Sequence, residues 1–223
     1  MNILPCCNNS KKLIEKGDHA LLLLSPWNSY FKEDNIEKLW HYGSGNFNRC
    51  NFIIFDKPSI WNLKAFNYDA ERIEKRVRKE INCLFNRVIR VLERNGLDNT
   101  TAKNMLLLWH YYENSNVFLD TLYKIKEHYE KNKIFKEKCL NLSKEVISNF
   151  RIPGISIGNG DPFLSVNYLL EEMPFYINAP KILNVPSSVW FYHKPNYFFD
   201  NELMTGKLGI EINPYQGGAV INF

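Results

Sequence analysis

The chain has few residues that could hold a structural metal and no segment long enough to cross a membrane. Its five cysteines form no CxxC pair and no Cys/His spacing typical of a metal site. We therefore expect free thiols in a reducing compartment, with no metal and no other cofactor. No apolar run is longer than the five residues of Ala20–Leu24, far fewer than a bilayer requires. The first residues also lack a signal peptide's apolar run and cleavage site, so we expect a cytoplasmic protein.

Several motifs of nucleotide and ester chemistry are missing as well. No P-loop and no dinucleotide-binding fingerprint occurs, and the glycines of residues 43–47 (GSGNF) predict only a turn. No G-x-S-x-G sequence surrounds Ser25, which disfavours the nucleophile elbow of a serine hydrolase at that position.

What the chain does contain is ample apolar material, arranged as alternating strands and helices. It is 45% hydrophobic and 14% aromatic, and its 223 residues fit one domain. Short apolar runs predict strands at 19–25, 51–56 and 188–193, with weaker ones at 208–212 and 219–223. Longer periodic segments predict helices at 34–42, 69–95, 162–172 (before Pro174) and most of 100–149, with a break near 114–116. This alternation predicts an α/β fold with a largely parallel sheet flanked by helices.

One predicted helix, residues 69–95, has a strongly basic face. It holds eight basic and five acidic residues, and so accounts for +3 of the net charge of +4. The excess of one sign argues against salt bridges along the helix, and arginine forks suit phosphate oxygens. The pattern indicates binding to a nucleic-acid backbone, with an ordinary solvated helix face as the alternative. The cations on this face are Arg72, Lys75, Arg76, Lys79, Arg87, Arg90 and Arg94.

A serine stands at the end of the first predicted strand. Ser25 directly follows the apolar run, at the edge where parallel sheets bind ligands. His19 faces the same side of that strand but lies about 20 Å away at the usual rise per residue, so we expect it to be structural. Taken alone, Ser25 is better interpreted as an ordinary turn serine.

Two further segments carry candidate catalytic side chains. Tyr168 and Glu172 are four residues apart, so they share a helix face where a phenol and a carboxylate could hold an ammonium group. Glu171 is expected to face solvent. Tyr192 and His193 end a predicted strand. A surface glutamate beside a half-buried tyrosine remains the structural alternative for the first segment, and a packed tyrosine remains the alternative for the second.

Together these segments resemble the motifs of the cyclodipeptide synthase family. The first motif of that family is read here as His19, Leu23, Ser25, Pro26, Asn28, Ser29, Tyr30 and Phe31. The second, Tyr-x-x-x-Glu-x-Pro, is matched by Tyr168, Glu172 and Pro174, and a Tyr-His pair follows at Tyr192 and His193. Asn28 with that pair resembles the branch of the family defined by Asn, Tyr and His. The resemblance spans residues 19–193 and makes the basic helix similar to the family's tRNA-binding helix.

The resemblance implies a single Rossmann-like domain over residues 1–223, akin to the catalytic domains of class I aminoacyl-tRNA synthetases. The HIGH and KMSKS signatures of those synthetases are missing, so ATP-driven activation is not expected. The expected substrates are two aminoacyl-tRNAs, which arrive already activated as esters. The expected product is a cyclic dipeptide, formed by a monomeric enzyme in a ping-pong reaction.

The resemblance also implies roles for the candidate side chains. Ser25 would accept the first aminoacyl group, and Tyr168 and Glu172 would hold its amino group. Tyr192 would relay a proton when the ring closes. Asn28 and His193 would support the geometry around Ser25 and Tyr192.

The pocket for the first aminoacyl group is expected to be apolar and to favour hydrophobic amino acids. Leu23 stands where the family usually has glycine, and a leucine there would narrow the pocket. The residues expected to line it are Leu21, Leu23, Ile53, Phe55, Phe175 and Trp190. Two other functions remain open: a serine esterase or hydrolase that uses Ser25, and a non-catalytic tRNA-binding module that uses the basic helix.

Overall fold

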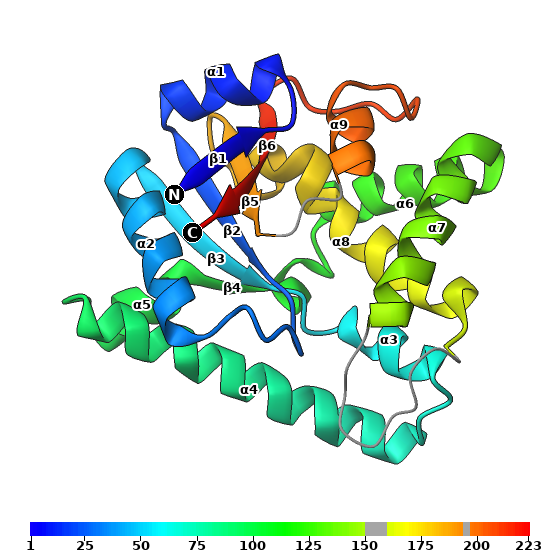
Figure 1. Cartoon of the computed structure of the whole chain (residues 1–223), viewed down its shortest axis with the longest axis horizontal. Helices are drawn as coiled ribbons and strands as arrows, with labels where there is room; N and C mark the ends of the chain where they lie inside the picture. Colours follow the sequence, from blue (N-terminus) through cyan, green and yellow to red (C-terminus); the bar gives the residue numbers. More distant parts are fainter. Residues whose placement is uncertain (150–159, 194–196) are drawn as a thin grey trace.

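A computed structural model shows one sheet of six strands in the order β1-β6-β5-β2-β3-β4 (Figure 1). It describes residues 1–149, 160–193 and 197–223. β1 is antiparallel to β6, and every other neighbouring pair is parallel, which confirms the predicted largely parallel α/β arrangement. The strands are β1 (Asn2–Pro5), β2 (His19–Leu24), β3 (Arg49–Ile54), β4 (Leu106–Leu108), β5 (Ser188–Tyr192) and β6 (Gln216–Asn222).

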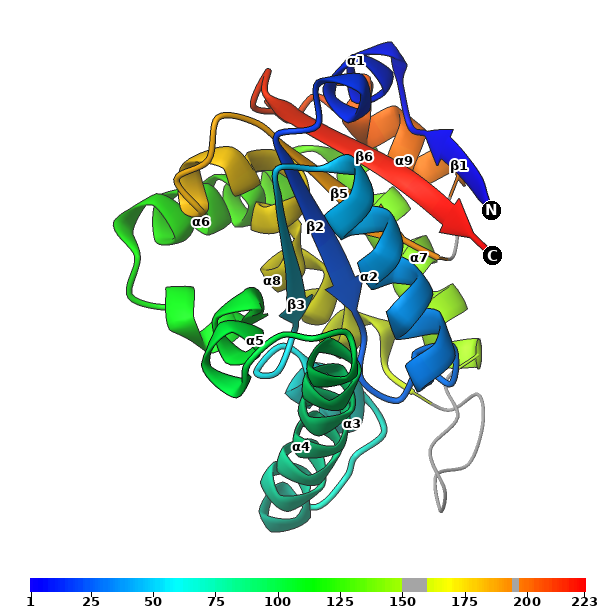
Figure 2. The same ribbon diagram turned by 90° about the vertical axis from the view of Figure 1, so that its left-hand side faces the viewer.

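Helices cover both faces of this sheet. Figure 2 shows α2 on one side of β2 and β3, with α8 on the other side. The helices are α1 (Asn8–Lys16), α2 (Glu33–Asn46), α3 (Ser59–Ala65), α4 (Ala70–Arg94), α5 (Asn99–Met105), α6 (Asn116–Lys131), α7 (Lys133–Asn149), α8 (Pro162–Ile182) and α9 (Tyr197–Met204), with a 3-10 turn η1 (Trp109–Tyr112).

The apolar run of β2 serves two separate cores because successive side chains of a strand point to opposite faces. Leu22 and Leu24 pack into a cluster with residues of α2 and α4. Leu21 and Leu23 pack into a second cluster, which includes Phe175 of α8. A strand buried on both faces has no polar alternation, and this explains why the run is continuous.

The predicted strands at 19–25, 51–56, 188–193 and 219–223 are confirmed, within a few residues at their ends, as β2, β3, β5 and β6. The helix over 69–95 is also confirmed: the Asp69 side chain accepts a hydrogen bond from the Glu71 amide (2.9 Å), and Gly96 follows the last turn with a φ of 91°.

Three predicted elements are wrong. Residues 208–212 form no strand. The segment 100–149 is interrupted by β4 and η1, because three apolar residues pair with β3 there. The helix that starts at Pro162 continues past Pro174 to Ile182, with a kink at Asn178 (φ −146°, ψ 24°). Burial of that helix on several sides offsets the cost of its interior prolines.

Candidate active site

Ser25 and Tyr192 meet because β2 and β5 are neighbouring parallel strands that end at the same edge of the sheet. The Ser25 hydroxyl lies 3.1 Å from the Tyr192 hydroxyl. The Tyr168 hydroxyl of α8 donates to the same serine oxygen from the other side, at 3.5 Å. Ser25 is half-buried, so its oxygen lies between two phenols and remains within reach of a substrate.

Glu172 is a buried carboxylate one helical turn beyond Tyr168. Glu172 is only 7% exposed, and this burial raises the pKa of its carboxyl to about 8. Hydrogen bonds with Tyr168 and Tyr176 lower the pKa, whereas the charge of Asp200 raises it. The Tyr176 hydroxyl donates to Glu172 Oε1 at 3.3 Å. Tyr168, Glu172 and Tyr176 follow one another at steps of four residues, so they share one face of α8.

The phenols around Ser25 are proton donors at neutral pH. Burial raises the pKa of Tyr192 to about 12, and burial together with the charge of Glu172 raises the pKa of Tyr168 well above its ordinary value. Neither side chain can therefore act as a phenolate base at rest. By contrast, the raised pKa of Glu172 lies close to neutrality.

Asn28 and His193 complete the cluster. Asn28 Nδ2 donates to the Tyr192 hydroxyl at 3.2 Å and lies 3.4 Å from His193 Nε2. The His193 ring stacks on Tyr30, with ring centroids 3.8 Å apart and an interplanar angle of 13°. The amide of Tyr30 donates to Asn28 Oδ1 at 3.0 Å, so the loop after Ser25 holds the asparagine from its own backbone.

A cavity of about 340 Å³ opens beside these residues, and all six predicted catalytic side chains line it: Ser25, Asn28, Tyr168, Glu172, Tyr192 and His193. Tyr176 and Asp200 also line it, and the sequence analysis missed both. The spacing of Tyr176, four residues after Glu172, was a signal that could have found it. Asp200 left no such signal. Among the described residues, no lysine or arginine lines the cavity, so the carboxylates of Glu172 and Asp200 face a positively charged ligand group without a competing lysine or arginine.

The structure divides the six residues predicted for the apolar pocket. Trp190 lines the cavity, whereas Leu21, Leu23, Ile53, Phe55 and Phe175 do not. These five are at most 1% exposed and pack against one another in a closed cluster between the sheet and α8. Leu23 and the aromatic side chains fill the space where a pocket was expected.

Glu171 does not face solvent as expected. Its side chain is 13% exposed, and Lys126 Nζ lies 3.7 Å from its carboxylate. The two neighbouring glutamates of α8 therefore have separate environments: Glu172 lines the cavity, and Glu171 lies outside it beside a lysine.

The basic face of α4 is divided between exposed and engaged cations. Arg72, Lys75 and Lys79 are exposed. Arg76 donates to the hydroxyl of Tyr68, and its guanidinium lies 5.1 Å from the centre of that ring.

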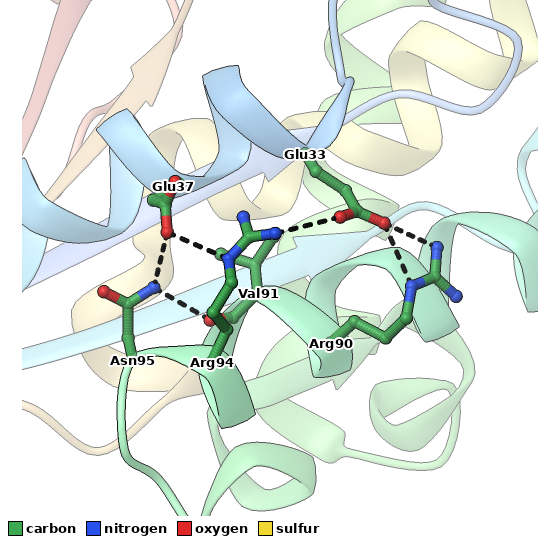
Figure 3. Close-up of polar contacts among 6 residues, drawn as sticks. All are labelled: Glu33, Glu37, Arg90, Val91, Arg94 and Asn95. Carbon is green, nitrogen blue, oxygen red and sulfur yellow. Dashed lines mark hydrogen bonds and ion pairs between the residues drawn. The ribbon is translucent and has the colours of Figure 1, made fainter.

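The cations of the C-terminal half contact α2 and the loop before it. Arg87 Nη1 donates to the Phe31 carbonyl at 2.6 Å. Arg90 donates to Glu33 at 2.7 and 2.9 Å, and Arg94 contacts Glu33 and Glu37, each at 3.3 Å (Figure 3). Salt bridges were not expected along this helix, and Arg90 and Arg94 instead pair with glutamates of a different helix, 57 to 61 positions away in the chain.

Two histidine sites lie apart from Ser25. His19 is 1% exposed and lies 2.8 Å from Ser188 Oγ and 3.2 Å from Asn51 Oδ1, which confirms a structural role. His110 Nδ1 lies 2.5 Å from Asp56 Oδ2 at the ends of β3 and β4. Neither histidine lines the cavity, so neither is placed to act as a base on Ser25.

The described residues show no feature that would require a membrane or a metal. No helix within them is long and apolar enough to span a bilayer. No group of three or more His, Cys, Asp or Glu in the described part of the chain is placed to hold an ion. All five cysteines are free, as expected.

Comparison with known proteins finds the same fold in solved structures and relatives from one protein family. A cyclodipeptide synthase from Bacillus thermoamylovorans superposes with a TM-score of 0.88 at 25% identity, over 99% of this chain and 96% of that one. A Mycobacterium tuberculosis structure superposes with a TM-score of 0.80 at 22% identity, over 98% of this chain and 91% of that one. That structure is described as demonstrating that cyclodipeptide synthetases are related to type I tRNA synthetases. The cyclo(L-leucyl-L-leucyl) synthase of Staphylococcus haemolyticus is 25% identical over 217 residues, 96% of this chain and 91% of that protein.

The fold is therefore that of a solved cyclodipeptide synthase, an α/β arrangement around one largely parallel sheet. A model of the family named cyclodipeptide synthase matches residues 1–222. The chain belongs to the cyclodipeptide synthase family, whose members form cyclic dipeptides.

Proposed function

We propose that this protein joins the aminoacyl groups of two aminoacyl-tRNAs into a cyclic dipeptide through an aminoacyl ester on Ser25. The observation that carries the proposal is the position of the Ser25 hydroxyl, between the hydroxyls of Tyr168 and Tyr192 at the wall of a cavity that also holds Glu172. Exchange of one ester for another needs little driving force, and a covalent intermediate divides the synthesis into simpler steps. ATP is not required because each substrate arrives as an activated ester.

In the first step the Ser25 oxygen attacks the ester carbonyl of one aminoacyl-tRNA. The bond to the ribose oxygen breaks, the tRNA leaves with a proton, and an aminoacyl ester remains on Ser25. Its α-ammonium group enters a site that contains the Glu172 carboxylate and no fixed cation among the described residues.

In the second step Glu172 takes a proton from that ammonium group. The pKa of Glu172 is raised to about 8, close to the range of about 7.7–8.0 typical of α-amino groups, so the transfer is nearly balanced. The free amine attacks the second aminoacyl-tRNA, whose tRNA departs. A dipeptidyl ester on Ser25 results.

In the last step the terminal amine of the dipeptide attacks the Ser25 ester, and the ring closes. The serine oxygen must regain a proton, and the Tyr192 hydroxyl at 3.1 Å is placed to relay it. Asn28 and His193 keep that phenol in position from the far side.

The test is synthesis by the purified protein from a pool of charged bacterial tRNAs, with products identified by mass spectrometry. Wild-type protein should release diketopiperazines, and Ser25→Ala should release none. Ser44→Ala is the control, since Ser44 is an exposed serine that does not line the cavity. Product from Ser25→Ala at the wild-type rate would rule out the proposed intermediate.

The two alternative functions predict different results in the same assay. A serine esterase would turn over simple esters without tRNA, but no histidine among the described residues is hydrogen-bonded to Ser25. A non-catalytic tRNA-binding module would bind tRNA and release no product. Such a module gives no reason for a buried carboxylate beside two phenols and a serine.

A further inference from the structure

The loop between β2 and α2 carries Ser25 and Asn28, and α4 contacts it at two backbone positions. The Trp27 amide donates to Glu80 Oε1 at 3.4 Å. Arg87 Nη1 donates to the Phe31 carbonyl at 2.6 Å. Glu80 and Arg87 are seven residues apart, so they lie on one face of α4 and reach the two ends of the same short loop.

The same face of α4 also fixes the start of α2. Arg90 and Arg94 hold Glu33, and Arg94 and Asn95 hold Glu37, as Figure 3 shows. Asn95 Nδ2 donates to Glu37 Oε1 at 3.0 Å. The loop is therefore held between the end of β2 and a helix start that α4 anchors.

The loop needs such support because its backbone is strained. Trp27 has a φ of 59°, in the left-handed region. This conformation costs a residue with a Cβ atom about 1–2 kcal/mol of conformational free energy. It persists only where the surrounding structure holds the backbone in place. Trp27 stands between Ser25 and Asn28, so relaxation of its backbone would move both side chains relative to Tyr192.

We propose that Arg87 is a positioning residue for the reaction. Its hydrogen bond to the Phe31 carbonyl, together with the one that Glu80 accepts from the Trp27 amide, sets the geometry of Ser25 and Asn28. The inference rests on the proposed function and adds a second role to α4. Its exposed cations Arg72, Lys75 and Lys79 remain available to phosphates, whereas Arg87 acts on the catalytic loop of its own chain. Arg87 is half-buried, and its donor is already engaged by a backbone oxygen.

The experiment compares Arg87→Met with Lys79→Met, which removes one cation from the same helix at an exposed position. Transfer of the aminoacyl group to the enzyme is measured in single turnovers at increasing aminoacyl-tRNA and at several salt concentrations. Arg87→Met should lower the maximal rate about tenfold to a hundredfold, as expected when reacting groups are displaced by a fraction of an ångström to an ångström. The salt dependence of its binding should match that of the wild type.

Lys79→Met should show the opposite pattern: it should bind aminoacyl-tRNA more weakly but keep the wild-type maximal rate. The slope of log affinity against log salt concentration should become shallower by about one. Arg87→Lys, which keeps one donor, should recover part of the lost rate. If Arg87→Met instead behaves like Lys79→Met, Arg87 is a phosphate contact and the inference is wrong. Loss of thermal stability with an unchanged maximal rate per folded molecule would also overturn it.

Two further controls keep the outcomes distinct. If Arg87→Met does not fold, Glu80→Ala tests the same loop through the Trp27 amide, and an unchanged maximal rate in that variant would contradict the inference. Wild-type protein is measured alongside. Absence of transfer by the wild type would reject the proposed function, whereas wild-type transfer with a normal Arg87→Met rate rejects only the role of Arg87.

Discussion

At the scale of single residues, the environment of Glu172 determines what it can do. Burial raises the pKa of this carboxyl to about 8, and the nearby charge of Asp200 raises it further. A carboxylate with an ordinary pKa would be too weak a base for an ammonium group. The neighbouring glutamate of the helix, Glu171, lies beside Lys126 and outside the cavity.

The pH dependence of the proposed second step follows from this pKa. Glu172 accepts a proton only when it is ionised, so the conversion of aminoacyl-enzyme to product should rise with pH through about 8 and then level off. Glu172→Gln should slow the conversion on the plateau, because no carboxylate takes the proton, and aminoacyl-enzyme should accumulate. Quench-flow measurement between pH 6 and about pH 9 checks this.

Glu171→Gln is the matched control because it removes one negative charge at the adjacent position, outside the cavity. This variant should reach the wild-type plateau rate. If both variants reach that rate, Glu172 is not the group that accepts the proton.

A second prediction at this scale concerns His19, which joins β2 to β5 and β3 through Ser188 and Asn51. Burial lowers the pKa of its imidazole from 6.5 to about 4. The folded protein therefore binds this proton less readily than the unfolded chain. The free energy of unfolding should fall as the pH drops below 6.5 and continue to fall toward about pH 4, by about 3 kcal/mol in total for this group.

The difference between wild type and His19→Gln isolates that contribution from other acid-sensitive groups. Denaturant unfolding at a series of pH values should show a stability difference in favour of the wild type near pH 7 that shrinks by pH 4.5. A difference that stays constant over this range would mean that His19 does not titrate as its burial implies.

At the scale of elements, α4 combines two kinds of cation on one helix. The sequence periodicity was sufficient to predict the helix and its basic face. It could not show that Arg90 and Arg94 pair with Glu33 and Glu37, since these pairs join positions more than 50 residues apart. Long-range pairing depends on the packing of two helices, which local periodicity does not record.

This division predicts how tRNA binding responds to salt. A cation that contacts a phosphate contributes about one unit to the slope of log affinity against log salt concentration. Replacing Arg72, Lys75 and Lys79 with glutamine should therefore flatten that slope by up to about three. Arg94→Gln is the control on the same helix, because its guanidinium already pairs with Glu33 and Glu37. Its slope should stay near that of the wild type. Equal flattening by Arg94→Gln would show that the pairs open when tRNA binds.

The elements that sequence reasoning missed are short or polar. β4 has only the three residues Leu106–Leu108, too few for a periodic signal, and it lies between two helical segments. α1 exposes much of its surface and buries only Ser10 and Leu13. By contrast, β2 and β5 were predicted because strands buried on both faces leave continuous apolar runs.

At the scale of the whole molecule, the sheet brings together residues that are far apart in the chain. Ser25 follows β2, Tyr192 ends β5, and Glu172 comes from α8, yet they line one cavity. The candidate catalytic residues were recognisable from their motifs and spacing. The apolar pocket was not, because whether Leu23 and Phe175 line a cavity or fill a core depends on side-chain packing between the sheet and α8.

The most direct test of the account is the mass of the enzyme after reaction with a single kind of aminoacyl-tRNA. The protein should gain the mass of one aminoacyl group on the peptide that contains Ser25, and a second aminoacyl-tRNA should convert that adduct to a cyclic dipeptide at least as fast as steady-state turnover. Ser25→Ala should gain no such mass. Formation of the cyclic dipeptide with no adduct on Ser25, or with an adduct that forms more slowly than product, would contradict the account.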